Sequence, residues 1–187
     1  MYHKNEKIYE AILKNLDENG HRLPSEEMSD TEQVARFIFM HIGQALLYLH
    51  EEANMIHRDI KLDNILFDSE NCEAKLSDFT VSRGDITESS RLFDCEGTAC
   101  FTAPECTIPE KEGYLPKPTD IWSTGVCIFT YITGCVPFYG DCELQIQINT
   151  RQNELKIPDT FSANLKDLIG KMINKDPLAR PTAYEFL

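Results

Sequence analysis

Apolar residues recur at helical spacing in the first half of the chain. Side chains three or four positions apart share one face of a helix, so the pattern predicts a long amphipathic helix whose apolar side carries Val34, Ile38, Ile42, Ala45 and Leu49. The segment SDTE at 29–32 has the form of a capping box and predicts its start. Similar spacing predicts an earlier helix over residues 7–16, ended by the Asn-Gly pair at 19–20.

Two short apolar runs then predict a β-hairpin. Residues 65–67, Ile-Leu-Phe, are typical of a buried strand, and residues 74–77 form a second strand after the turn-forming sequence DSEN at 68–71. Asp78 follows the second strand directly. The hairpin is therefore expected to return Asp78 to a position facing Asn64.

The most apolar region lies at 121–139. It includes serine and threonine, and Gly134 and Pro137 end it. The remaining helix of about 13 residues is too short to cross a bilayer and predicts a buried core helix. Further expected features are a turn at 137–140, a helix at 143–150, a helix capped by Ser162 and another that starts after Thr182.

Polar residues beside the hairpin suggest a chemistry. Asp59, Asn64 and Asp78 supply a carboxylate that can orient a hydroxyl and two oxygen ligands for Mg²⁺ beside a triphosphate. Lys61 adds a cation between them. A solvated loop with a chance HRD triplet is the alternative.

Several motifs follow one another in a fixed order. HRDIKLDN at 57–64, SDF at 77–79, APE at 103–105, DIWSTGV at 120–126 and Arg-Pro at 180–181 occur as in eukaryotic protein kinases. From residue 29 to 187 the chain resembles the large C-terminal lobe of a serine/threonine protein kinase, and it is most similar to the calcium/calmodulin-dependent kinase and kinase-kinase group.

The resemblance implies a fold and a domain assignment. The fold expected is mainly α, with a small β-hairpin region carrying the catalytic and metal-binding loops. Residues 1–187 are assigned to a partial kinase domain with an activation segment at 78–105. The 187 residues contain no G-x-G-x-x-G loop and no V-A-I-K-like lysine. We expect the small lobe to be absent, so that this piece alone transfers phosphate poorly.

The function implied is ATP- and Mg-dependent transfer of the γ-phosphate to serine or threonine hydroxyls of proteins. Asp59 would accept or orient the substrate hydroxyl, Lys61 would contact the transferred phosphate, and Asn64 and Asp78 would hold the metal. Thr98 is expected to hydrogen-bond to Asp59 and Lys61. Lys61 also indicates serine/threonine specificity. A lobe that docks other proteins without catalysis is the alternative function.

The resemblance assigns further residues around this set. Leu66 would lie under adenine, although by itself it reads as an ordinary core leucine. His57 is expected to pack against Phe79 and to have no acid-base role. Asp63 stands where kinases that prefer basic peptides have an acid, although an exposed acid needs no partner.

The activation segment departs from the family in two places. Thr80 replaces a glycine, so the backbone after Phe79 should have fewer conformations and metal binding should be retained. Asp94, four residues before Thr98, stands where many kinases carry an activating phosphate. It is expected to pair with Arg58 and order the segment without phosphorylation, unless it is simply an exposed loop acid.

Three residues outside the loops are expected to be structural. Glu105 and Arg180 match a buried ion pair of the family. Asp120 should accept backbone N–H groups from the catalytic loop. Cys100 lies in the wall that receives the residue after the phosphoacceptor, and no cation near it in sequence favours a reactive thiol.

Composition limits the partners. The net charge of −13 argues against nucleic acid and anionic membranes and favours basic peptides, unless the acidic surface only aids solubility. Seven scattered cysteines without a C-x-x-C pair, and the absence of a continuous apolar segment near residue 1, predict an intracellular, cytoplasmic protein.

Overall fold

The computed structural model describes residues 30–68, 71–107 and 112–187. The expected helix at 7–16 and the capping residue Ser29 lie outside these ranges. Helices dominate the described residues, and one two-stranded antiparallel sheet accompanies them. The expected mainly α fold with one small β-hairpin is therefore confirmed. The elements are α2 (Asp30–Leu47), β1 (Ile65–Asp68), β2 (Glu73–Leu76), α3 (Lys117–Thr133), α4 (Glu143–Gln152), α5 (Ala163–Met172) and α6 (Ala183–Phe186).

Helix α3 runs through the centre of the core. Trp122 and Val126 have no exposed surface, and every residue from 119 to 129 is buried. Gly134 ends the helix with a φ of 75°, as its sequence position predicted. The start was predicted too late, because the first turn is polar. Lys117 and Pro118 belong to it, and proline needs no hydrogen-bond donor there.

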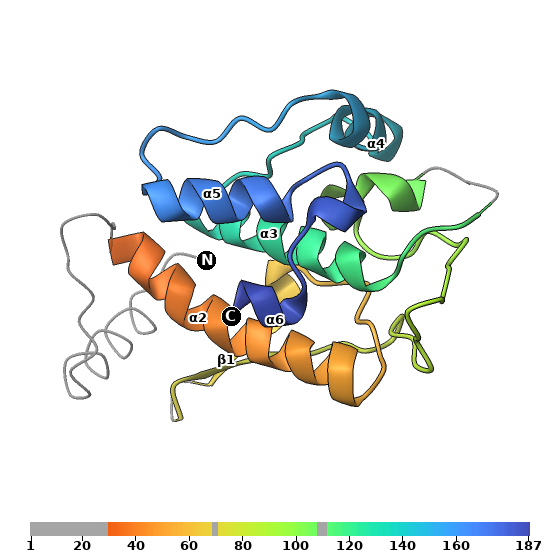
Figure 1. Cartoon of the computed structure of the whole chain (residues 1–187). Coiled ribbons are helices and arrows are strands. Elements are labelled where there is room, and N and C mark those ends of the chain that lie inside the picture. The colour runs from red at the N-terminus through yellow and green to blue at the C-terminus, as the bar shows by residue number, and fades with distance from the viewer. Residues whose placement is uncertain (1–29, 69–70, 108–111) are drawn as a thin grey trace.

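Helix α2 presents its apolar face to the other elements. It packs against the hairpin, α3 and α6 (Figure 1). Ile42 and Leu46 are fully buried, while the predicted core residue Ala45 is only partly buried. Gly43 marks the closest approach, since an added Cβ would lie 2.7 Å from the ring of Phe186 in α6. After α2, a π-helical turn at Tyr48–Glu52 leads toward the HRD loop.

The hairpin forms where the sequence predicted it, with two corrections. The second strand is Glu73–Leu76, one residue earlier than expected, and Ile65 pairs with Leu76. The first strand is not buried, because the side chain of Leu66 points away from the core and is 56% exposed. The hairpin packs one of its faces against α2. Successive side chains of a strand point to opposite faces, so alternate residues such as Leu66 lie on the other face.

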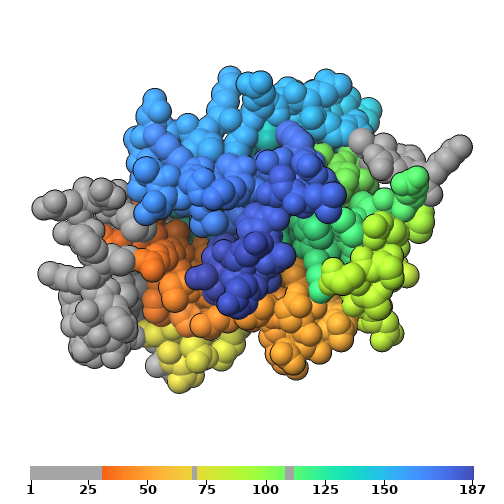
Figure 2. All heavy atoms as spheres, viewed as in Figure 1, coloured from red at the N-terminus to blue at the C-terminus, as the bar shows by residue number. Residues whose placement is uncertain are grey.

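The last third wraps over the core helices. Ser162 caps α5 by accepting the backbone N–H of Leu165, and Thr182 forms a capping box with Glu185 at the start of α6. Helix α4 begins at Glu143 as predicted and extends two residues further, to Gln152. In the space-filling view the C-terminal residues lie across the middle of the visible face, between the segments that carry α2 and α5 (Figure 2).

Candidate active site

One buried carboxylate fixes the HRD loop. Asp120, in the first turn of α3, accepts the backbone N–H groups of His57 and Arg58, each at 2.9 Å, and the Nε2 of His50 at 2.9 Å. Burial would raise the pKa of Asp120, but the hydrogen bond and charge of His50 and the two N–H groups outweigh burial and lower it. The predicted structural role of Asp120 is confirmed.

His57 links the HRD loop to the second strand. Its Nε2 donates to the carbonyl of Ser77 at 3.0 Å, and its Nδ1 then accepts the N–H of Asp59 at 3.3 Å. The ring meets that of Phe79 edge-on, with centroids 4.8 Å apart. Both nitrogens are used by the backbone, which agrees with the predicted packing role of His57.

Asp59, Lys61 and Thr98 form a polar network in which each side chain contacts the other two. Its Oδ1 accepts the hydroxyl of Thr98 at 2.8 Å, and its Oδ2 lies 2.8 Å from Lys61 Nζ, which also donates to Thr98 Oγ1 at 3.0 Å. Burial opposes ionisation of Asp59, but the hydrogen bonds from Lys61 and Thr98 lower its pKa below the usual value. The expected contacts of Thr98, which is 37 residues from Lys61 in sequence, are confirmed.

Asn64 connects this network to the hairpin. Its Nδ2 donates to the carbonyl and Oδ2 of Asp59, at 2.8 and 3.2 Å, so its Oδ1 is the amide atom that remains for another ligand. The Asn64 carbonyl accepts both the N–H and the hydroxyl of Ser77, at 2.9 and 3.0 Å. Asp78 is the next residue, so the hairpin brings it back beside Asn64 as predicted.

Asp78 is exposed and held by its own loop. Its Oδ1 accepts the hydroxyl of Thr80 at 2.5 Å and the Thr80 N–H at 3.3 Å, and these bonds lower the pKa of Asp78. The left-handed φ of 63° belongs to Asp78, whereas Thr80 has no positive φ and its β-branched side chain fits. Sequence reasoning noted that Thr80 restricts the backbone but missed its hydroxyl as a donor.

The available oxygens fit Mg²⁺. Asp78 Oδ2 and Asn64 Oδ1 are hard ligands on adjoining strand ends, and Mg²⁺ takes few protein ligands and completes its shell with phosphate and water. No cluster of three or more His, Cys, Asp and Glu side chains that could hold a metal occurs in the ranges described. A site of the predicted kind therefore depends on the phosphates of a nucleotide for its remaining ligands.

The activation segment is held to the HRD loop by Asp94. Its carboxylate lies 2.8 Å from Arg58 Nη2 and 3.8 Å from Arg83 Nη1, and its carbonyl accepts the Tyr114 hydroxyl at 2.7 Å. Burial would raise the pKa of Asp94, but the hydrogen bond and charge of Arg58 lower it. The predicted contact between Asp94 and Arg58 is confirmed.

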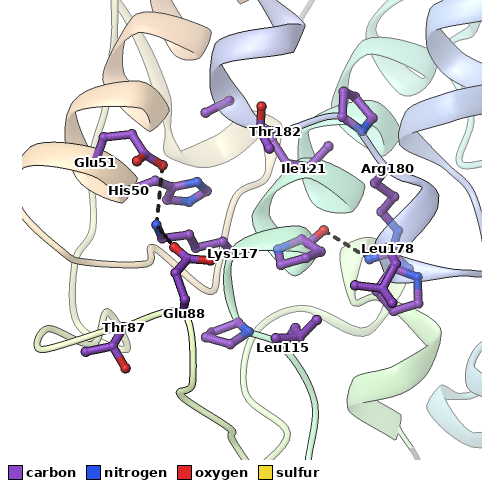
Figure 3. Close-up of a pocket in the computed structure, with 15 residues that line it drawn as sticks. His50, Glu51, Thr87, Glu88, Leu115, Lys117, Ile121, Leu178, Arg180 and Thr182 are labelled. Carbon is purple, nitrogen blue, oxygen red and sulfur yellow. Dashed lines mark hydrogen bonds and ion pairs between the residues drawn. The ribbon is translucent and has the colours of Figure 1, made fainter.

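A second contact holding the segment was missed by sequence reasoning. Lys117 Nζ lies 2.8 Å from Glu88 of the segment and 3.3 Å from Glu51 of the π-helical turn. These residues line one end of a hollow of about 230 Å³, whose other end is formed by Leu178 and Arg180 (Figure 3). Lys117 follows a proline at the start of α3, and nothing in the local sequence pattern indicated this role.

The end of the activation segment is fixed to the last helices. Arg180 donates to both carboxylate oxygens of Glu105, at 2.6 and 2.8 Å, and its side chain has no exposed surface. It also donates to the carbonyls of Pro118 and Asn174. The predicted ion pair is confirmed, and its bidentate geometry is the strong form of such contacts.

Other predicted site residues lie at the surface near this network. Leu66 and Phe79 are 56% and 45% exposed, and Asp63 is exposed as well. Cys100 is partly buried, in a 3-10 turn at Ala99–Phe101. The geometry leaves the assigned roles of Leu66, Asp63 and Cys100 as predictions.

Comparison with known proteins identifies the family of this chain. The family described as "Protein kinase domain" matches residues 1–187. The chain belongs to the protein kinase family. It is 36% identical over 154 residues to CBL-interacting protein kinase 26 of Oryza sativa subsp. japonica, with 80% of this chain and 30% of the relative covered. It is 36% identical over 151 residues to serine/threonine-protein kinase GRIK2 of Arabidopsis thaliana, with 81% and 37% covered.

A third relative extends the range of organisms. The chain is 36% identical over 155 residues to the probable serine/threonine-protein kinase MARK-C of Dictyostelium discoideum, with 82% of this kinase chain and 19% of the relative covered. All three names are those of protein kinases, and two of them say serine/threonine kinase. The matches cover between 19% and 37% of these relatives' lengths. No helix in the described part of this kinase chain has both the length and the apolar character needed to span a membrane.

Proposed function

We propose that this chain takes part in ATP- and Mg-dependent transfer of the γ-phosphate to serine or threonine hydroxyls of proteins. The observation that carries the proposal is the set of contacts joining Asp59, Lys61, Thr98 and Asn64. A bound divalent ion would neutralise phosphate oxygens, with Asn64 and Asp78 as its protein ligands. The steps that follow concern the chain's own side chains.

Asp59 orients the incoming hydroxyl and accepts its proton at Oδ1 or Oδ2. The hydrogen bonds from Lys61 and Thr98 outweigh the effect of burial on the pKa of Asp59, so burial does not protonate the carboxylate and an acceptor is ready when the hydroxyl arrives. Lys61 contacts both Asp59 and Thr98 and presents its ammonium group toward the transferred phosphate. Thr98 fixes one carboxylate oxygen and so limits the rotation of Asp59.

The charge of the chain supports a proposal for the substrate class. Asp63 is exposed beside the network and the net charge is −13, so we propose that basic protein segments are preferred over nucleic acid or membrane surfaces. We further propose an intracellular, cytoplasmic location, in which the seven cysteines stay reduced. Leu66 is proposed to contact the adenine of ATP from the exposed face of β1.

A transfer assay tests the proposal. These residues, as part of a complete kinase, are incubated with Mg²⁺, ATP labelled at the γ-phosphate and a basic peptide containing serine, and label in the peptide is measured. We expect label that disappears in Asp59→Asn, because the amide accepts no proton. Equal labelling by the two proteins contradicts the role of Asp59.

The second candidate is a docking module without catalysis. The exposed apolar side chains Leu66 and Phe79 beside the network favour it, since apolar surface of this kind can also receive a protein. This alternative predicts no transfer of label, together with no Mg²⁺-dependent protection of the hairpin by ATP in hydrogen exchange.

A further inference from the structure

A basic hollow lies outside the candidate active site. It has a volume of about 430 Å³ and shares no lining residue with the network around Asp59. Arg91 of the activation segment, Arg151 of α4 and Lys175 after α5 all line it. Three cations meeting at one hollow are unexpected in a chain with 31 acidic and 18 basic residues.

The three cations differ from most lysines and arginines of the described ranges in forming no ion pair with an acid. Among the described residues, ion pairs within 4.0 Å are formed by Arg58, Lys61, Lys75, Arg83, Lys117, Lys166, Lys171 and Arg180. The basic residues of those ranges that form none are Arg36, Arg91, Arg151, Lys156 and Lys175. Three of these residues line one hollow, so positive charge is in excess there.

The carboxylates of the hollow do not neutralise these cations. Glu105 is bound through both oxygens to Arg180. Asp176 accepts the N–H of Leu178 at 2.9 Å and caps the following 3-10 turn. An anion entering the hollow therefore meets three cations, which outnumber the one lining carboxylate, Asp176, that forms no ion pair.

Each cation keeps donors available. Arg91 Nη1 donates to the carbonyl of Ser90 at 2.9 Å, and Arg151 Nη1 donates to the carbonyl and hydroxyl of Thr107, both at 3.3 Å. A guanidinium has five N–H groups, so most of them remain. These contacts hold one side of each planar group and leave the other side able to bind two oxygens of an anion.

Lys175 is the most constrained of the three. Its Nζ donates to the carbonyl of Thr150 and lies 3.8 Å from the ring centre of Phe138. Burial and the charge of Arg180 lower its pKa to about 8. The negative charge of a bound anion would raise the pKa of Lys175 again, against the effects of burial and Arg180. Binding of the anion and protonation of Lys175 would therefore favour one another.

Backbone contacts keep Arg91 at the hollow. Leu92 and Tyr114 exchange two backbone hydrogen bonds, at 3.0 and 2.9 Å. Gly113 lies against this bridge with a φ of 69°, and an added Cβ would be 2.7 Å from the Leu92 carbonyl. Arg91 is thus placed by a short fixed pairing and not by a free loop.

We propose that the hollow binds a phosphoryl group carried on a serine or threonine of a peptide. A tetrahedral dianion offers several acceptor oxygens, which matches two guanidinium groups and one ammonium group. The remaining wall is largely apolar, with Pro104, Leu115, Pro177 and Leu178. Such a wall suits the residues that flank a phosphorylated side chain and gives a peptide an advantage over free phosphate.

Fluorescence anisotropy with the 187-residue chain tests this. The probes are a labelled peptide with one phosphoserine and apolar flanks, the same peptide with serine, and inorganic phosphate as competitor. We expect the phosphopeptide to bind at least about tenfold more tightly than the serine peptide, because charge-assisted hydrogen bonds are lost without the phosphate. Inorganic phosphate should displace it weakly.

Two double variants provide the matched comparison. Arg91→Gln with Arg151→Gln should weaken phosphopeptide binding by about tenfold. Arg36→Gln with Lys156→Gln removes the same charge from the two unpaired cations outside the hollow, and should change binding by less than about twofold. Thermal unfolding of both variants checks that they fold.

Several results would overturn the proposal. These are no binding, equal binding of the two peptides, and equal loss in the two double variants, which would indicate attraction by overall charge. Displacement by inorganic phosphate at the concentration of the peptide itself would show that the hollow takes the free anion and would exclude the peptide.

Discussion

The carboxylate of Asp94 contacts the guanidinium of Arg58 at 2.8 Å, and so joins the activation segment to the residue directly before Asp59. Asp94 stands four residues before Thr98, where the resemblance to other kinases implies an activating phosphate. A fixed negative charge at this position supplies part of the attraction that a phosphate would give. The segment should then be ordered without modification.

An Asp94→Asn variant tests this role of the ion pair. The amide keeps the shape but loses the charge, so Arg58 is held less firmly and the activation segment should open more often. We expect phosphate transfer to fall about fivefold and cleavage within residues 83–97 by a protease to become faster. Glu96→Gln is the control, because Glu96 is an exposed acid two residues away. Unchanged transfer and cleavage in Asp94→Asn would assign Asp94 to an ordinary loop.

The same pair predicts a dependence of stability on pH. The pKa of Asp94 in the folded chain lies below its ordinary value of 3.8, because Arg58 outweighs the effect of burial. A carboxyl group with a lowered folded pKa stabilises the fold above the unfolded pKa, and this contribution is lost as pH falls through the folded pKa.

Urea unfolding of the parent and of Asp94→Asn at several pH values measures this effect. The parent should be the more stable protein at pH 6, and the difference should shrink at pH values below 3.8. Because Asp94 is 46% exposed, screening by solvent makes the difference small. A difference that stays constant across this range would show that the charge of Asp94 has no part in it.

Local patterns predicted the elements well. The spacing from Val34 to Leu49 and the stop at Gly134 identified α2 and α3, since burial on one face and a left-handed cap are both visible in sequence. The motifs also located Asp59 and Thr98, whose contact spans 39 residues, but through resemblance to a family and not through local pattern.

The sequence-based predictions failed where the environment of a residue is formed by residues that are far away in the sequence. Leu66 reads as buried, yet no second sheet covers its face of the hairpin in the part of the chain described. Lys117 pairs with Glu51 and Glu88, which are 66 and 29 residues away, and a lone lysine carries no sign of such partners. The gathering of Arg91, Arg151 and Lys175 likewise depends on three separate elements.

The ion pair between Glu105 and Arg180 should contribute strongly to stability. In Glu105→Gln the fully buried guanidinium of Arg180 loses its counter-charge and one of its two hydrogen bonds to residue 105, because the amide has one acceptor oxygen. The carbonyls of Pro118 and Asn174 remain as acceptors. Removal of one partner of a buried pair costs about 3–5 kcal/mol. Urea unfolding should show a loss of this size, whereas Glu154→Gln on the exposed surface should change stability by less than about 0.5 kcal/mol. A loss below about 1 kcal/mol would mean that the guanidinium of Arg180 is hydrated in the variant and that the buried ion pair contributes little.

Thr80 should limit motion of the loop that carries Asp78. Its hydroxyl and N–H both donate to Asp78 Oδ1, and its β-branched side chain excludes conformations that glycine allows. In Thr80→Gly the amides of residues 79–81 should exchange with solvent about tenfold faster, because one restraint and one hydrogen bond are lost.

Thr80→Ser separates the two effects. Serine keeps the hydroxyl donor but lacks the methyl group, so its exchange rates should stay closer to those of the parent than to those of the glycine variant. Hydrogen exchange followed by NMR resolves these amides. Equal rates in all three proteins would show that Thr80 restrains nothing.

The contact between Thr98 and Asp59 should affect transfer more than stability. Without the hydroxyl, Asp59 Oδ1 loses its donor and the carboxylate can rotate against Lys61, so fewer molecules hold it in the orientation that receives a substrate hydroxyl. We expect Thr98→Val to lower kcat about tenfold or more with little change in KM for ATP, and Thr98→Ser to retain most of the activity. Both variants keep the side chain's approximate size, and Thr98 is only partly buried, so the unfolding midpoints should differ little. Full activity in Thr98→Val, with its unfolding midpoint unchanged, would show that Lys61 and Asn64 suffice to orient Asp59.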